Sequence, residues 1–355
     1  MNTREEVLEI LSKIPDPEAK TDIVSANLVS SLTIEKDLIT VEISSKNPAL
    51  HARKRMEEAV VFRLQSELRL KTEVHCIVRA MKGEERSARR SVLPDVKHVI
   101  AIASGKGGVG KSTLTANLAV GLAAEGYTVG LIDADIYGPS MPTMFDVQGQ
   151  RPHLTSVGEK SLIEPISNHG VKLLSIGFFT DQDNAVVWRG PMASKALTQM
   201  ITEGNWGVLD FLLIDLPPGT GDIHLSLAQT LPLDGVVIVS TPQEVALADA
   251  RRGINMFSIE GLNVPIVGIV ENMSWFTPAE LPENRYYLFV RDGAKNLAHG
   301  LNIPFLGAIP LVQSIREAGD VGRPAVLQKA SPIGIAFTDL VRTFVKELAS
   351  IKNKK

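Results

Sequence analysis

A glycine-rich segment with two lysines is the part of the chain best equipped for chemistry. It reads GKGGVGKST and fits the pattern G-x-x-x-x-G-K-[ST], which follows a strand and begins a helix. Glycines let backbone N–H groups close around phosphate oxygens, and the start of a helix favours an anion. Lys111 can supply a cation to the β- and γ-phosphates, and the Ser112 hydroxyl can bind Mg²⁺. The residues that we expect to bind a nucleoside triphosphate here are Gly105, Lys106, Gly107, Gly108, Val109, Gly110, Lys111, Ser112 and Thr113.

Carboxylates at the ends of two apolar segments are the next candidates. Asp133 ends the segment TVGLID, Asp135 follows two residues later, and Asp215 ends FLLID. A carboxylate at the end of a buried strand is poorly solvated and needs a cation or donors, so each could act on Mg²⁺ or water. Asp133 could instead cap a turn, and both roles stay open. Asp222 precedes a helical pattern and is more simply its N-cap.

Short apolar runs that alternate with helical periods must position these residues. Such runs suit strands buried on both faces, so the sequence predicts an α/β fold of the P-loop NTPase class. Helices would flank a mostly parallel sheet. The segment between Leu154 and Gly170 resembles an inserted hairpin, and residues 337–351 form an amphipathic helix that we expect in the core. The predicted strands read HVIAIAS, TVGLID, VKLLSIG, FLLIDL, GVVIVST, PIVGIV and PFLGAI.

A smaller unit is expected before this sheet. Residues 1–81 combine two helical patterns with alternating segments, among them a hairpin over residues 27–44, and they predict a small α+β domain. Residues 82–95 are highly charged and contain a proline near their end, so we interpret them as a linker. The P-loop ATPase domain would then cover residues 96–355.

The composition limits the class of protein. The chain has 355 residues, a net charge of −3 and a single cysteine, Cys76. One thiol excludes an intrachain disulfide, a C-x-x-C redox pair and an all-cysteine metal site within one subunit. The balanced charge gives no general case for nucleic acid or an anionic membrane, and no apolar run is long enough to cross a bilayer. We therefore expect a cytoplasmic protein that binds neither.

The loop contains a second lysine, Lys106, which resembles the extra lysine of one group of P-loop ATPases. KGGVGKST is similar to the deviant Walker A loop of the MinD, ParA and nitrogenase iron-protein ATPases. The resemblance implies that Lys106 reaches the nucleotide of a partner subunit in a homodimer, so the expected catalytic residues are Lys106, Lys111 and Asp135. It also implies that Asp135 orients the attacking water and that Asp215 takes the Walker B role near Mg²⁺.

One asparagine and the absence of one motif indicate which nucleotide base the site would recognise. In this group an asparagine after a late strand reads adenine, and Asn272 in PIVGIVENMS matches that position. Asn272 could also be a turn residue at a strand end. The chain has no N-K-x-D guanine motif, so we expect ATP and Mg²⁺ as ligands.

Longer strings resemble one branch of that group, the Mrp/ApbC-type iron-sulfur cluster carrier ATPases. They lie between residues 97 and 345 and include LIDADIYGPSMP, VVWRGPM, LIDLPPGTGD and IPLVQSIREAGD. The N-terminal unit, with IPDPE and DIVSANLV, resembles the MIP18-like domain that precedes the ATPase in some members. The resemblance implies a nucleotide-switched carrier or assembly factor for iron-sulfur clusters, with a cluster donor or an apo-protein acceptor as its partner.

The chain departs from this branch at the cluster ligands. In members that hold a bridging [4Fe-4S] cluster, a C-x-x-C shortly after the ENMS segment lets two subunits supply four thiolates. Here that place reads SWFTPAELP, and SSKNPALHA lacks the cysteine that is frequent in the MIP18-like domain. Cys76 shares a strand face with Val74 and Val78 and is expected to be buried. We name no cluster ligand, and cluster binding by this chain stays an open question.

Two other functions fit parts of the sequence. A ParA/MinD-like ATPase for spatial organisation would bind a membrane or the nucleoid, and only the basic residues 352–355 after an amphipathic helix favour it. A nucleotide-switched scaffold that has lost cluster binding would explain the missing thiols. The strings RGPM and PPGTGD favour the carrier.

Overall fold

A computed structural model shows the chain as two compact units, Met1–Ser91 and Val92–Lys355, each with its own hydrophobic core. The predicted linker over residues 82–95 falls largely outside the described residues and stays a prediction. The structure describes residues 3–16, 21–35, 38–45, 50–68, 73–80, 92–136, 138–158, 160–179, 190–259, 262–278, 280–281 and 283–353.

The N-terminal unit is built on a three-stranded sheet in the order β3-β4-β5. β3 and β4 pair antiparallel, whereas β5 pairs with β4 in parallel. The predicted hairpin is confirmed, although its turn at residues 36–37 lies outside the described part. The elements are α1 (Arg4–Leu11), β1 (Pro15–Asp16), β2 (Thr21–Asp22), β3 (Val29–Glu35), β4 (Leu38–Ser45), α2 (Leu50–Glu67) and β5 (Glu73–Ala80).

Cys76 lies in the core of this unit. On β5 it shares the inner face with Val74, while His75 between them is exposed. Only 6% of Cys76 is exposed, and burial raises the pKa of its thiol to about 12, with the Glu57 carboxylate adding to the rise. The expectation of a buried cysteine is confirmed. A thiol that stays protonated is a poor nucleophile and a poor metal ligand.

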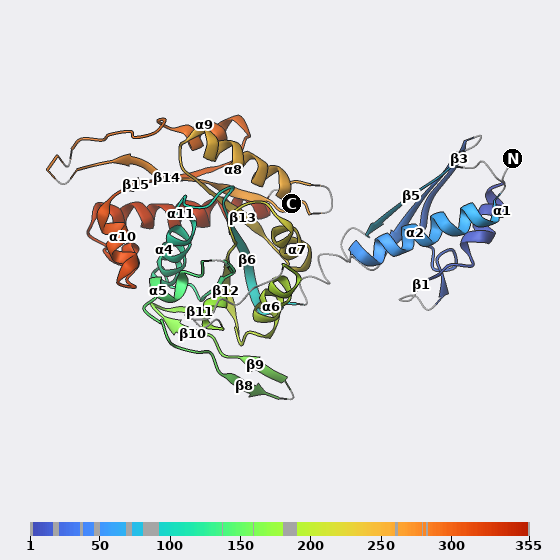
Figure 1. Ribbon diagram of the computed structural model, residues 1–355, viewed down its shortest axis with the longest axis horizontal. Helices are drawn as coiled ribbons and strands as arrows, with labels where there is room; N and C mark the ends of the chain where they lie inside the picture. Colours follow the sequence, from blue (N-terminus) through green and yellow to red (C-terminus); the bar gives the residue numbers. More distant parts are fainter. Residues whose placement is uncertain are drawn as a thin grey trace. The chain divides into compact units, whose positions relative to one another are not determined.

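The larger unit contains an eight-stranded sheet in the order β10-β11-β7-β12-β6-β13-β14-β15 (Figure 1). All neighbours in it are parallel except β10, which pairs antiparallel with β11 at one edge. Its strands are β6 (Val96–Ala103), β7 (Val129–Asp133), β10 (Ile166–Asn168), β11 (Val171–Ser175), β12 (Leu209–Asp215), β13 (Gly235–Ser240), β14 (Ile266–Phe276) and β15 (Phe305–Leu311). The seven predicted strands are therefore confirmed.

Helices cover both faces of the large sheet, and one hydrophobic core lies on each side. The core of one face takes side chains from α6, α7, α8 and α9, and that of the other from α4, α5, α10 and α11 (Figure 1). The helices are α4 (Lys111–Ala124), α5 (Met141–Met144), α6 (Gly190–Glu203), α7 (Asp222–Thr230), α8 (Glu244–Phe257), α9 (Gly293–Gly300), α10 (Gln313–Asp320) and α11 (Pro332–Asn353), with 3-10 turns at Ile176–Phe178 and Ala325–Leu327.

Two expectations outside the sheet have different outcomes. β8 (Leu154–Val157) and β9 (Lys160–Ile163) form the predicted hairpin, but the segment does not end there, because its last strand, β10, joins the large sheet. In α11 the apolar stripe is buried and packs on the core, as expected. No helix in the described ranges is both long and apolar enough to cross a membrane.

Candidate nucleotide-binding site

The loop between β6 and α4 takes its shape from glycines. Gly108 and Gly110 both have a φ of +80°, a left-handed conformation that L side chains rarely adopt. Gly110 also has no room for a side chain, since a Cβ there would lie 2.1 Å from Asn272 Nδ2. Asn272, on β14, donates from its amide to the Val109 carbonyl at 2.8 Å. The loop is thus held against β14 at the start of α4, where backbone N–H groups are free to bind an anion.

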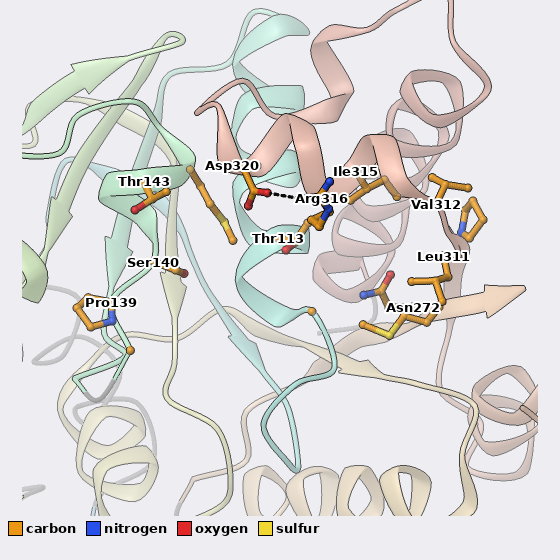
Figure 2. A pocket seen from close by; sticks show the side chains of 16 residues that line it. Thr113, Pro139, Ser140, Thr143, Asn272, Leu311, Val312, Ile315, Arg316 and Asp320 are labelled. Atoms are coloured by element: carbon orange, nitrogen blue, oxygen red, sulfur yellow. Dashed lines mark hydrogen bonds and ion pairs between the residues drawn. The ribbon is translucent and has the colours of Figure 1, made fainter. Parts of the chain in front are cut away.

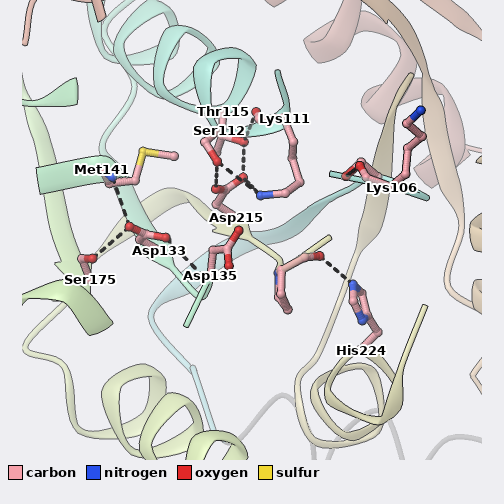
Figure 3. A network of polar contacts seen from close by, with 12 residues as sticks. Lys106, Lys111, Ser112, Thr115, Asp133, Asp135, Met141, Ser175, Asp215 and His224 are labelled. Atoms are coloured by element: carbon pink, nitrogen blue, oxygen red, sulfur yellow. Dashed lines mark hydrogen bonds and ion pairs between the residues drawn. The ribbon is translucent and has the colours of Figure 1, made fainter. Parts of the chain in front are cut away.

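Asp215, at the end of β12, is the centre of a polar cluster (Figure 3). Its carboxylate is fully buried and lies 2.8 Å from Lys111 Nζ. The hydroxyl of Ser112 donates to one carboxylate oxygen at 2.6 Å, and that of Thr115 donates to the other at 2.7 Å. These partners offset the cost of burying the charge. The structure therefore brings together Lys111 and Ser112, which are adjacent in the sequence, and Asp215, which lies 103 positions after Ser112.

Thr115 is a member of the cluster that the motif did not identify. It lies one helical turn after Lys111, and its hydroxyl also hydrogen-bonds to the Lys111 carbonyl at 2.9 Å. The signal available in the sequence is this spacing of four residues on a helix. Ser112 and Asp215 together offer hydroxyl and carboxylate oxygens, the hard ligands that Mg²⁺ prefers, so the donor set fits that ion.

Asp133, at the end of β7, organises the turn that follows it. Its carboxylate accepts hydrogen bonds from the Met141 N–H at 3.1 Å, the Ser175 hydroxyl at 2.9 Å and the Asp135 N–H at 3.3 Å. Burial raises the pKa of Asp133 to about 7, and the nearby Asp215 carboxylate adds to the rise, while these donors oppose it. Of the two roles left open, the structure supports the holding of a turn.

This raised pKa predicts a pH-dependent stability. Because the folded value of about 7 exceeds the ordinary 3.8, the stabilisation is complete below the ordinary value and is lost as the pH rises through 7. In nucleotide-free protein with a chelator, the free energy of unfolding should fall by up to roughly 3 kcal/mol between about pH 5 and pH 8. Asp133→Asn should remove most of that fall in urea titrations. The prediction would be contradicted if the free energy of unfolding fell equally with pH in the wild type and in the Asp133→Asn variant.

A pocket of about 240 Å³ lies above the glycine-rich loop. The loop residues from Gly107 to Thr113 line it together with Asp135 and Pro218. Lys106 does not line this pocket, and in Figure 3 its side chain points away from Asp215. Its Nζ forms no hydrogen bond or ion pair within the described part of the chain. The structure thus places Lys111, Ser112 and Asp135 at one phosphate-sized pocket and Lys106 outside it.

A second cavity, of about 550 Å³, shares Gly110, Thr113, Ser140 and Met144 with the first (Figure 2). Asn272 and Met273 form one part of its wall, residues 138–144 form a second, and residues 310–320, from the end of β15 through α10, form a third. Its volume is within the range of small-molecule sites, and most of its walls are apolar with a few polar groups. The cavity residues that the sequence analysis missed are Met273, Leu311, Val312, Ile315, Arg316 and Asp320. They lie in the strings ENMS and IPLVQSIREAGD, which indicate the family but assign these residues no task, and only the folding of β15 and α10 beside β14 brings them together.

The segment from the end of β14 to the start of α9, residues 274–292, is called here the β14 extension. Phe276 and Tyr286 pair across it through two hydrogen bonds of 2.8 Å, and the Arg285 guanidinium lies 4.5 Å from the Trp275 ring. Large apolar side chains are exposed along it, including Leu288, which is 58% exposed. At its root, the buried Glu271 carboxylate accepts hydrogen bonds from the Ala294 N–H at 2.7 Å and from the Ser274 hydroxyl.

The β14 extension does not fit a cluster held by thiolates, because it contains no cysteine. Within the ranges that the structure describes, no group of three or more His, Cys, Asp or Glu side chains is placed to hold a metal ion.

The fold and this site together define a class of protein. A parallel sheet carries a glycine-rich loop between an internal strand and a helix, with a lysine, a hydroxyl and a strand-end aspartate gathered beside it. This is the architecture of a P-loop NTPase.

The chain belongs to a particular family within that class. Residues 95–345 match the family model described as the NUBPL iron-transfer P-loop NTPase. Residues 4–75 match a second model, described as an iron-sulfur cluster assembly protein. The resemblance to iron-sulfur carrier ATPases of the ParA and MinD group is thereby confirmed.

Individual relatives agree with this assignment. The chain is 42% identical over 334 residues to the iron-sulfur cluster carrier protein of Synechocystis sp., with 93% of each chain covered. A solved nucleotide-binding protein from Archaeoglobus fulgidus, in complex with ADP, is 36% identical with a TM-score of 0.59, covering 72% of this chain and 96% of that one. MinD from Aquifex aeolicus has the same fold, at 24% identity and a TM-score of 0.50, covering 70% of this chain and 97% of that one.

Proposed function

We propose that this protein is a Mg²⁺-dependent ATPase that serves iron-sulfur cluster carriage or assembly in the cytoplasm as a nucleotide-switched homodimer. The observation that carries the ATPase is the cluster of Lys111, Ser112 and Asp215 beside two joined cavities, one of phosphate size and one of nucleoside size. The names of the relatives support an iron-sulfur cluster as the cargo that the protein carries.

Each residue of the site has a distinct task in this proposal. Lys111 and the loop N–H groups hold the phosphates, and Ser112 and Asp215 hold Mg²⁺. The ion, when bound, neutralises charge on the β- and γ-phosphates. Asp135 lines the phosphate pocket, which supports its task of orienting the attacking water. Asn272 forms part of the cavity wall where the adenine would lie.

Lys106 has no task within its own subunit. Its side chain points away from Asp215, and its N-ζ lies outside the phosphate pocket (Figure 3). A second copy facing the site could receive this lysine at its nucleotide, which supports a dimer that closes around ATP. Closure and hydrolysis would then switch the geometry of the dimer.

The cargo cannot be held by the usual four thiolates of two subunits. Each copy has one cysteine, and Cys76 is buried with a pKa raised to about 12. We therefore place at least part of the ligand set on the protein that donates or accepts the cluster. Such a carrier would form a coloured complex only together with its partner.

Anaerobic reconstitution tests the cargo. The full chain is incubated with ferrous iron and sulfide, alone and with candidate apo-protein acceptors, and absorbance and iron per dimer are measured. We expect the chain alone to bind little iron and the mixture with an acceptor to gain a cluster faster when ATP is present. A protein that stays colourless alone and leaves every acceptor unchanged would contradict the carrier function.

That second outcome would favour another candidate, a nucleotide-switched scaffold that has lost cluster binding. The observation that favours it is the exposed apolar surface of the β14 extension, where no thiol is present. A scaffold of this kind would still bind ATP and dimerise, so the ATPase measurements alone do not separate the two.

A further inference from the structure

His224 is a buried titratable side chain that none of the tasks above uses. It lies in the first turn of α7, and only 2% of it is exposed. Its Nε2 is 2.9 Å from the carbonyl oxygen of Pro217, which follows Asp215 by two residues (Figure 3). The imidazole therefore contacts the backbone that leads directly out of the Mg²⁺-binding position of the proposed site.

This contact determines which ring nitrogen carries the hydrogen. A carbonyl oxygen can only accept a hydrogen bond, so Nε2 must be the donor. Nδ1 is buried and has no hydrogen-bond partner in the part of the chain that the structure describes. Burial lowers the pKa of His224, and Lys111 acts in the same direction, while the Pro217 and Gly221 backbone and Asp135 oppose it. The ring is therefore held neutral, with Nε2–H on Pro217.

Pro217 belongs to a loop, residues 216–221, that joins Asp215 to α7. The Leu216 N–H donates to the Ile102 carbonyl at 3.1 Å, and the Gly219 N–H donates to the Ser104 carbonyl at 3.0 Å. Between these two bonds lie two prolines, which have no N–H to donate. The hydrogen bond from His224 ties the loop down at this stretch, one residue before Pro218, which lines the phosphate pocket.

We propose that His224 is a positioning residue for ATP hydrolysis, which sets the loop 216–221 against the phosphate pocket through the Pro217 carbonyl. It lines neither of the two cavities of the site. The inference rests on the proposed ATPase function. Because Pro218 of this loop lines the pocket where the terminal phosphate would react, a small displacement of the loop should slow the chemical step more than it weakens binding of ATP.

Three substitutions separate the hydrogen bond from the mere filling of space. His224→Gln keeps an N–H donor at about the reach of Nε2. His224→Asn stays polar but is too short, and His224→Leu fills the space without a donor. We expect kcat to fall about tenfold in the Leu and Asn variants, the size of effect of one lost hydrogen bond, with KM for ATP changed less than about twofold. The Gln variant should keep at least about half of the kcat.

Hydrogen exchange of the peptide containing residues 216–221 provides a second readout, which does not depend on turnover. Exchange at Gly219 should be faster in the Leu and Asn variants and unchanged in the Gln variant. His153→Leu, the same change at an exposed histidine, is the control and should match the wild type in both measurements. If the Leu variant does not fold, the comparison of Asn with Gln decides.

Wild-type kcat in a folded Asn variant, or a Gln variant as impaired as the Asn variant, would overturn the inference. A wild-type protein with no ATPase activity would instead refute the proposed function. In that case the exchange measurement still tests whether His224 holds the loop, because it needs no nucleotide.

Discussion

Lys111→Ala should abolish ATP binding and lower kcat/KM for ATP hydrolysis by at least about 10²-fold, the effect of removing one preorganised donor from a phosphate or oxyanion site. Lys111 is 5% exposed, and its Nζ lies 2.8 Å from Asp215 beside the phosphate pocket. Among the residues that the structure describes, no other lysine lines that pocket. Titration with a fluorescent ATP analogue and steady-state phosphate release measure the two effects.

A matched control is available on the same part of the chain. Lys97, on β6, is 64% exposed and lies 3.8 Å from Asp210, so Lys97→Ala removes a lysine without touching the site. It should bind and hydrolyse ATP as the wild type does. Because Lys111→Ala leaves the buried Asp215 without its cation, thermal unfolding must confirm that the variant is folded. A folded Lys111→Ala protein with normal ATP affinity would contradict the assignment of this site.

The second large effect concerns Lys106 and the homodimer. Lys106→Ala should retain ATP binding, since its side chain lies outside the phosphate pocket of its own subunit, but should lose hydrolysis by about 10³-fold or more, as expected for a lysine or arginine supplied by a partner. Asp135→Asn should also be inactive, because it removes the carboxylate at the phosphate pocket to which we assign the positioning of the attacking water. Phosphate release from each variant alone gives the baseline.

Mixing the two inactive variants tests whether Lys106 acts on the partner's nucleotide. In a mixed dimer, the subunit with Lys106→Ala keeps its own Asp135 and receives Lys106 from the other copy, which completes one site of two. An equimolar mixture should therefore regain about one quarter of wild-type activity, since about half of the dimers are mixed. If Lys106 acts within its own subunit, the mixture stays inactive.

The control for this experiment is the double variant with Lys106→Ala and Asp135→Asn on one chain. Mixed with Asp135→Asn, it leaves no site complete, so no activity should return. Activity in this control mixture would show that Asp135 is not the residue that positions water.

The sequence predicts the parts of this protein that are local. The glycine-rich loop, its lysine and its hydroxyl lie within nine residues, and the apolar runs around them are long enough to indicate buried strands. The position of Asp215 at a strand end was also readable, because a single aspartate closes an otherwise apolar run. Six of the seven predicted strands agree with the structure in their bounds to within about two residues, whereas β14 continues to Phe276, beyond the predicted segment PIVGIV.

The parts that depend on how distant elements meet could not be read in this way. Whether Asp133 or Asp135 faces the pocket depends on the turn after β7. The sequence alone places both carboxylates at the end of the same strand and does not show which of them points to the pocket. His224 has no motif at all, and its contact with Pro217 appears only when the loop folds back on α7. The cavity walls from β15 and α10 depend likewise on strand order.

The hydrogen bonds at the root of the β14 extension determine which part of this segment can change in sequence. The Glu271 carboxylate accepts hydrogen bonds from both ends of the β14 extension, from the Ser274 hydroxyl and the Ala294 N–H. The adjacent Asn272 donates a hydrogen bond to the Val109 carbonyl in the glycine-rich loop. These bonds use no side chain from residues 275–292. The side chains at the tip of the β14 extension can therefore change while Glu271 and Asn272 keep the same hydrogen bonds, so the sequence of the tip can vary independently of the nucleotide site.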